Sequence, residues 1–134
     1  MTLYVDTSAL AKLYIDEADS ADAQRFLRSD PVLVTSWLTV VELRRTLSRS
    51  LSGSDLQRSI MASEADLDQM ALINPSERVW RAASDIAIEL SVKSLDAIHL
   101  ASARALEIPT LTFCTFDLRM AQAARRLGFT VLGA

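Results

Sequence analysis

The sequence predicts an α/β fold with a short, mostly parallel central sheet. Short apolar runs alternate with longer segments in which apolar residues recur every three or four positions, as they do in helices that cover a sheet. Glycine and proline number only three each, too few for the many turns of an all-β sandwich or barrel. Strands separated by helices need crossover connections, and these join parallel strands that are covered on both faces.

The chain begins with a strand. Residues 3–5 form an apolar run that stops at Asp6, and Ser8 is placed to cap a following helix. A short helix is predicted over 21–29, and Asp30-Pro31 ends it. The β-branched run 32–35 then predicts a second buried strand.

The rest of the chain continues the alternation. Helices are predicted over 38–51 and 54–70, and residues 71–75 fit either a short strand or a connector. A helix is then predicted from Ser76 to Leu90, and another over 95–105 capped by Ser94. The run Thr110-Leu111-Thr112-Phe113 predicts a strand that ends near Thr115 and Asp117. A helix over 120–127, stopped by Gly128, and a strand over 129–132 complete the chain. No repeat or linker interrupts this pattern, so residues 1–134 are expected to form a single domain.

Composition excludes several classes of protein. Cys114 is the sole cysteine, so no internal disulfide can form and a reducing compartment is expected. The first residues lack the pattern of a signal peptide, and no uncharged apolar stretch approaches the roughly 20 residues that span a bilayer. We therefore expect a cytoplasmic protein without membrane contact. The formal charge of −3 offers no basic excess for nucleic acid.

Four acidic residues lie where strands lead into helices. Asp6 directly ends the first strand, and Asp117 follows the penultimate one. Glu42 and Asp96 are each expected in the first turn of a helix. In open α/β sheets, ligands bind beyond the carboxyl ends of the strands, so these four side chains are candidates for one common site.

Each acid also has a purely structural interpretation. Asp117 fits an N-cap, and Asp96 fits a first-turn acid that complements the helix dipole. Thr39 and Glu42 have the spacing of a capping box, and Asp6 could form an Asx turn. For any one of these residues alone, the structural role is the commoner one, and only the set favours chemistry.

The segments that carry the four acids resemble those of PIN domains. The resemblance covers essentially the whole chain and rests on Tyr4-Val5-Asp6-Thr7-Ser8-Ala9-Leu10, on Glu42, on Ser94-Leu95-Asp96-Ala97-Ile98-His99-Leu100-Ala101 and on Thr115-Phe116-Asp117. It is strongest to the VapC toxin branch, whose members are ribonucleases paired with a VapB antitoxin. It implies a three-layer α/β/α fold, a metal-dependent endoribonuclease that cuts RNA, a VapB-like antitoxin partner and a homodimer.

The resemblance also implies roles for individual residues. Asp6 and Asp96 would bind Mg²⁺ or Mn²⁺ directly, and Glu42 and Asp117 would do so directly or through water. Ser8 and Thr115 would be hydroxyl neighbours that orient the carboxylates. Hard divalent ions take such oxygen ligands. Many family members carry a further acid shortly after the position of Asp117, whereas here Leu-Arg-Met-Ala follows, which leaves open whether one or two ions bind.

Basic residues near the acids are candidates for phosphate contact. Arg45 and Arg49 follow Glu42 by one and two helical turns, and Lys93 and Arg119 flank Asp96 and Asp117. The alternative is a solvated helix surface with pairs of opposite charge three or four residues apart.

Four other residues are predicted to be structural. His99 lies on the same helical face as Asp96, but a lone histidine in an Ala- and Leu-rich helix favours a packed, hydrogen-bonded side chain over a catalytic base or metal ligand. Trp37 and Trp80 are expected to pack in the protein and not to stack on bases, and Cys114 is expected to lie in the core.

Two other functions compete with the nuclease. One is a non-catalytic PIN-like binding or assembly module whose acids are caps. The other is a phosphoacceptor of the receiver type, which needs paired acids after the first strand and a lysine on a late strand. The segments Asp6-Thr7-Ser8 and Thr110-Leu111-Thr112-Phe113 provide neither.

Overall fold

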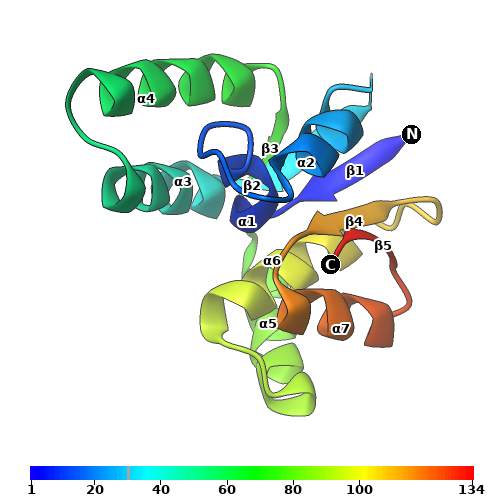
Figure 1. The fold of residues 1–134 in the computed structure, drawn as a ribbon. Helices are drawn as coiled ribbons and strands as arrows, with labels where there is room; N and C mark the ends of the chain where they lie inside the picture. The colour runs from blue at the N-terminus through cyan, green and yellow to red at the C-terminus, as the bar shows by residue number, and fades with distance from the viewer. Residues whose placement is uncertain (30) are drawn as a thin grey trace.

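The computed structural model describes residues 1–29 and 31–134, and within them it contains five strands and seven helices (Figure 1). In chain order they are β1 (Thr2–Val5), α1 (Thr7–Ala11), α2 (Ser20–Leu27), β2 (Val32–Ser36), α3 (Trp37–Ser50), α4 (Gly53–Asp68), β3 (Ala71–Ile73), α5 (Glu77–Leu90), α6 (Ser94–Ala105), β4 (Thr112–Thr115), α7 (Leu118–Arg126) and β5 (Thr130–Gly133). No helix of the described ranges is both long and apolar enough to cross a bilayer.

All neighbouring strands of the sheet are parallel. Their order is β3-β2-β1-β4-β5, so β1 is central, with Leu3 opposite Leu33 on β2 and Thr112 on β4. The carboxyl ends of all five strands therefore lie at one edge. The predicted parallel α/β fold is confirmed.

Helices cover both faces of the sheet, which gives three layers (Figure 1). Successive residues of a strand point to opposite faces, so Tyr4 joins the core formed with α5, α6 and α7, whereas Leu3 and Val5 join the core formed with α1, α3 and α4. Tyr4 and Phe113 stack at the centre of the first core, with ring centroids 5.1 Å apart. Leu43 and Leu47 of α3 are buried in the second.

Several element boundaries differ from the prediction. The ambiguous segment 71–75 contains the short edge strand β3, which pairs with β2. The first helix starts at Thr7 and is capped by Asp6, because the Asp6 carboxylate and not the Ser8 hydroxyl accepts from the backbone N–H of Ala9. Lys93, not Ser94, occupies the N-cap position of α6. Asp30 lies outside the described residues.

The strand β4 ends at Thr115, as predicted, and begins at Thr112, two residues later than predicted. Its end places Thr115 at the edge of the sheet where Asp6 also lies. Beside it, Gly133 has φ +110°, and a Cβ there would sit 2.1 Å from the carbonyl oxygen of Thr115, so only glycine fits this close approach. The C-terminal strand thus holds the backbone of Thr115 in place.

The α3 core supports the helix that carries Glu42, and its contribution to stability can be measured. Leu47→Ala removes a side chain that is fully buried, and we expect a loss of about 2–5 kcal/mol in the free energy of unfolding. Met61→Ala on α4, where the side chain is 71% exposed, is the matched control and should change that free energy by less than about 0.5 kcal/mol. Urea denaturation measures both, and equal effects would contradict the packing described for α3.

Candidate active site

A cavity of about 300 Å³ lies at the edge of the sheet where the parallel strands end. Its lining includes Asp6 after β1, Glu42 on α3, Asp96 on α6 and Asp117 before α7. The structure therefore brings together all four acids that the sequence singled out, from four separate segments. A slightly larger cavity of about 340 Å³ lies between the end of α6 and the start of β5, but it has no comparable set of acids among its lining residues.

Asp6 is the most buried of the four acids, with 3% of its surface exposed. Its Oδ1 accepts hydrogen bonds from Ser8 Oγ (2.6 Å) and from Ala9 N (3.1 Å), and its Oδ2 accepts from the hydroxyl of Thr115. Burial raises the pKa of Asp6 despite these three donors, with Ser8, Thr115 and His99 acting against the rise. The carboxylate is thus well oriented but short of positive charge.

The two hydroxyls form one unit with the backbone around Asp117. Ser8 Oγ and Thr115 Oγ1 lie 3.1 Å apart, and Ser8 Oγ accepts from Phe116 N at 2.9 Å. Thr115 Oγ1 accepts from Asp117 N at 3.1 Å. Ser8 and Thr115 therefore connect the position of Asp6 to that of Asp117.

Glu42 has the opposite electrostatic setting to Asp6. Its Oε1 accepts from Thr7 Oγ1 at 3.0 Å and lies 2.6 Å from His99 Nε2. Burial acts to raise the pKa of Glu42, but the hydrogen bond and charge of His99 and the hydrogen bond from Thr7 outweigh it and leave the pKa below its ordinary value. Glu42 is therefore held ionised.

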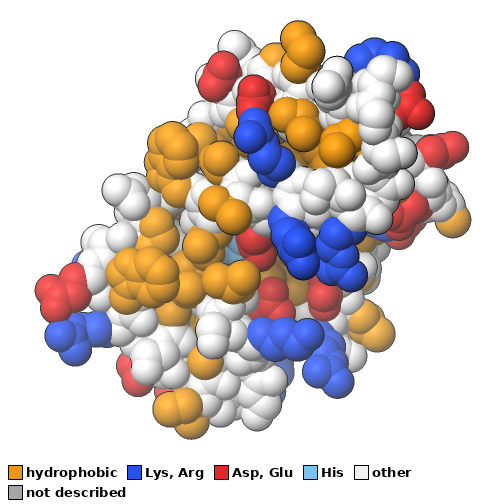
Figure 2. Space-filling model, turned by 90° about the vertical axis from the view of Figure 1, so that its left-hand side faces the viewer, with side chains coloured by type: hydrophobic (Ala, Val, Ile, Leu, Met, Phe, Trp, Pro, Cys, Tyr) orange, Lys and Arg blue, Asp and Glu red, His pale blue; other side chains and the backbone are white. Residues whose placement is uncertain are grey.

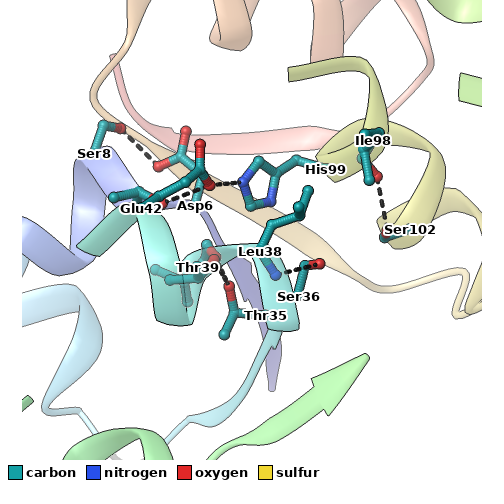
Figure 3. Close-up of polar contacts among 12 residues, drawn as sticks. Asp6, Ser8, Thr35, Ser36, Leu38, Thr39, Glu42, Ile98, His99 and Ser102 are labelled. Carbon is teal, nitrogen blue, oxygen red and sulfur yellow. Dashed lines mark hydrogen bonds and ion pairs between the residues drawn. The ribbon is translucent and has the colours of Figure 1, made fainter. Parts of the chain in front are cut away.

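The capping box proposed for Thr39 and Glu42 is wrong. The helix begins earlier, at Trp37, and Ser36 is its cap, accepting from Leu38 N at 3.1 Å. Thr39 is fully buried and its hydroxyl pairs with that of Thr35 at 2.7 Å (Figure 3). Glu42 consequently lies in the second turn of α3, which turns its side chain into the cavity.

Asp96 and Asp117 form the more open side of the cavity. Asp117 Oδ1 accepts from Met120 N at 3.0 Å, so the predicted N-cap is confirmed alongside the cavity position. Asp96, in the first turn of α6, has no hydrogen bond within the described part of the chain. Burial raises the pKa of Asp96, the negative charges of Asp117, Asp6 and Glu42 raise it further, and His99 opposes them. Asp96 is thus destabilised as an anion in the absence of a cation.

These oxygens fit a hard divalent cation. Carboxylates that repel one another, two of them with raised pKa values, gain most from a positive charge between them. In residues 1–29 and 31–134, however, no three acidic, histidine or cysteine side chains are close enough to form a complete metal cage. Water or substrate oxygens would have to complete the coordination, as is usual for Mg²⁺.

Sequence reasoning missed the partner of His99. The imidazole is 1% exposed and has a partner at each ring nitrogen. The Tyr4 hydroxyl lies 2.7 Å from Nδ1, and Glu42 Oε1 lies 2.6 Å from Nε2. The contact between His99 and Glu42 is drawn in Figure 3. The prediction that His99 is packed and hydrogen-bonded is confirmed. Tyr4 gave no signal of its own except that alternate strand residues share a face, which places it on the side of the sheet that α6 covers.

The basic candidates all lie on the surface. Arg45, Arg49, Lys93 and Arg119 are exposed, and none of them forms an ion pair with a residue of the described ranges. Their neighbour Arg44, by contrast, pairs with Glu64. Figure 2 shows acidic side chains with lysine and arginine side chains on both sides of them.

Two of the structural predictions hold and two fail. Cys114 is buried, which raises the pKa of its thiol to about 12, and His99 is packed as described above. Trp37 and Trp80 are not in the core, because 52% and 49% of their surfaces are exposed.

Comparisons with known proteins agree with this geometry. The PIN domain family model matches residues 3–126. Ribonuclease VapC46 of Mycobacterium tuberculosis is 34% identical over 130 residues, covering 97% of this chain and 95% of that protein, and ribonuclease VapC47 of the same species is 32% identical over 131 residues, covering 95% and 93%.

Solved structures share the fold. The crystal structure of Mycobacterium tuberculosis VapC20, described as a sarcin-ricin loop cleaving toxin, superposes with a TM-score of 0.77 at 22% identity and covers 98% of this chain and 99% of that one. VapBC2 from Rickettsia felis, bound to a promoter DNA fragment, gives a TM-score of 0.70 at 14% identity and covers 99% and 98%. The family model and the relatives together show that the chain belongs to the PIN-domain family, in the branch of the VapC ribonucleases, and the shared fold agrees with this.

Proposed function

We propose that this protein is a metal-dependent endoribonuclease and the toxin component of a VapBC-type pair. The observation that carries the proposal is the convergence of Asp6, Glu42, Asp96 and Asp117 in one cavity at the carboxyl edge of the sheet. The near full-length similarity to VapC ribonucleases supports the same conclusion. In a non-catalytic PIN-like module Asp96 would serve only the dipole of α6, since it caps no helix and makes no hydrogen bond in the described part of the chain, whereas a metal site accounts for its place beside the other three acids.

Asp6 and Asp96 would hold Mg²⁺ or Mn²⁺ directly, and Glu42 and Asp117 would do so directly or through water. When bound, such an ion lowers the pKa of a water and offsets negative charge on the phosphate. The chain itself contributes orientation: Ser8 and the Thr115 hydroxyl fix the Asp6 carboxylate, and the Met120 N–H fixes one oxygen of Asp117.

RNA would reach the cavity across four exposed basic side chains that lie close in sequence to its acids, here called the rim cations. Arg45 and Arg49 lie on α3, on the side of Glu42, and Lys93 and Arg119 lie on the side of Asp96 and Asp117. Arg119 also lines a groove of about 410 Å³ along α7 that includes Arg126. Since no acid of the described ranges pairs with these cations, they are free to contact phosphates.

The proposed partners are a VapB-like antitoxin and a second copy of this chain. Several structural neighbours are toxin–antitoxin complexes, among them VapBC from Salmonella typhimurium bound to DNA. Large apolar side chains are exposed on α3 and α5, including Trp37, Val41, Trp80 and Ile88. Such surfaces commonly mark protein contacts. The homodimer remains a prediction.

The nuclease proposal is tested by the acids of the cavity. Asp6→Asn and Asp96→Asn should lower cleavage of a structured RNA in Mg²⁺ or Mn²⁺ by more than about 100-fold, because each removes a charged oxygen from the ion. Asp85→Asn, at an exposed position of α5, is the control and should leave the rate unchanged. Equal cleavage by all three variants and the wild type would show that a contaminating nuclease is responsible.

Metal binding is tested independently of cleavage by stability. The pKa of Asp96 in the folded protein is raised above its ordinary value of 3.8. The protonated carboxyl group therefore contributes fully to the free energy of unfolding below pH 3.8, and this contribution is lost as the pH rises through the pKa of the folded state. At pH 7 without metal, Asp96→Asn should therefore be at least as stable as the wild type. Mn²⁺ at 100 times its Kd should reverse this order of stability, because it should raise the free energy of unfolding of the wild type by about 2.7 kcal/mol. Urea unfolding with Mn²⁺ or EDTA measures both, and an unchanged order would argue against an ion at Asp96.

The rim cations are tested by the salt dependence of RNA binding. In an Asp117→Asn background that keeps the RNA intact, Arg45→Ala and Lys93→Ala together should reduce the slope of log K against log salt by about 1.4, as expected for two lost contacts to single-stranded phosphates. Arg25→Ala with Arg81→Ala, two exposed cations paired with acids on their own helices, is the control. A slope that is the same in both double variants would reject the assignment.

A further inference from the structure

Tyr4, His99 and Glu42 form a hydrogen-bonded chain from the core to the cavity. The Tyr4 hydroxyl lies 2.7 Å from His99 Nδ1, and His99 Nε2 lies 2.6 Å from Glu42 Oε1. Tyr4 is fully buried and His99 is 1% exposed, whereas Glu42 reaches the cavity. The chain thus joins the central strand β1, helix α6 and helix α3.

The donor in the contact with Glu42 follows from the chemistry of the carboxylate. A glutamate carboxylate can only accept a hydrogen bond, so His99 Nε2 carries a proton and donates to Oε1. Tyr4 Oη lies beside Nδ1 at the other end of the ring, and the Ser102 hydroxyl is a second partner of Tyr4. Tyr4 therefore holds the His99 ring in its orientation.

These contacts hold one carboxylate oxygen of Glu42 and leave the other oxygen without a hydrogen bond in the described part of the chain. Oε1 accepts from both Thr7 Oγ1 and His99 Nε2, whereas Oε2 has no hydrogen-bond partner in the described part of the chain. A glutamate side chain loses substantial rotamer freedom when it is held in one conformation. The two donors impose that conformation before any ion arrives, so that Oε2 remains available to the cavity.

We propose that Tyr4 and His99 are positioning residues for Glu42: Tyr4 holds the His99 ring in its orientation, and His99 holds Glu42 by Oε1 so that Oε2 faces the ion. The inference rests on the proposed metal-dependent function. Neither residue needs to touch the RNA. Partners of this kind, which orient a ligand from outside the coordination shell, typically change metal affinity by about 10–100-fold.

Binding of Mn²⁺, measured by calorimetry without RNA, tests the positioning role. His99→Leu removes the donor to Glu42 and should raise the Kd for Mn²⁺ by about 10-fold or more. His99→Gln keeps an N–H at a similar reach and should restore most of the affinity. Leu100→Ala, at the next and fully buried position of α6, loses core packing without touching Glu42 and should leave the Kd unchanged. If Leu100→Ala weakens Mn²⁺ binding as much as His99→Leu does, the role is merely structural and the inference is overturned.

The proton on Nε2 is tested directly by nitrogen NMR, because the chain has one histidine and its ring signals need no assignment. In the wild type, Nε2 should carry a proton. Tyr4→Phe removes the hydroxyl beside Nδ1 and should raise the Kd for Mn²⁺ several-fold. An unprotonated Nε2 in the wild type, or an unchanged Kd in Tyr4→Phe, would overturn the inference.

Loss of the positioning role and loss of the nuclease function would give different results. If the wild type binds Mn²⁺ and cleaves RNA while His99→Leu binds Mn²⁺ equally well, the positioning role is wrong and the nuclease proposal stands. If the wild type neither binds Mn²⁺ nor cleaves RNA, the nuclease proposal itself is wrong and the inference falls with it.

Discussion

The buried carboxylate of Asp6, at the end of the central strand β1, is the constraint to which the rest of the site responds. A charge removed from water must be compensated, and the three hydrogen bonds that Asp6 accepts do not lower its pKa to the ordinary value. The same three donors nevertheless hold the carboxylate in one orientation. The fold therefore maintains an oriented carboxylate in a place short of positive charge, and a cation bound there, as proposed, would link the folding free energy to metal binding.

Glu42 and Asp96 show that the cavity assigns different electrostatic roles to chemically similar groups. Glu42, with donors from Thr7 and His99, has a lowered pKa, whereas Asp96, without a hydrogen bond in the described part of the chain, has a raised one. The difference arises from the hydrogen-bond donors and the neighbouring charges and not from burial, because burial acts to raise both pKa values. One acid is thus held in place by the protein, and the other is left to be held by an ion.

The sequence predicted what depends on local pattern and missed what depends on contacts across the chain. The parallel sheet and the seam positions of Asp6 and Asp117 follow from short apolar runs and the polar residues after them. The link between Tyr4 and His99 joins residues 95 positions apart, and it exists only because β1 and α6 pack together. Glu42 was placed one turn too early because Ser36, the residue that caps α3, also ends the preceding strand.

The acid excess of the chain is compatible with an RNA substrate because that excess is local. Acids outnumber Lys and Arg by 17 to 14, and once the four cavity acids are set aside the remaining chain carries one more base than acid. A bound divalent ion would offset the charge of those four acids, and the exposed cations Arg45, Arg49, Lys93 and Arg119 would then dominate the surroundings. Under the proposed function, attraction of a phosphodiester would therefore depend on the metal, which would make the ion a condition for substrate binding as well as for the chemistry.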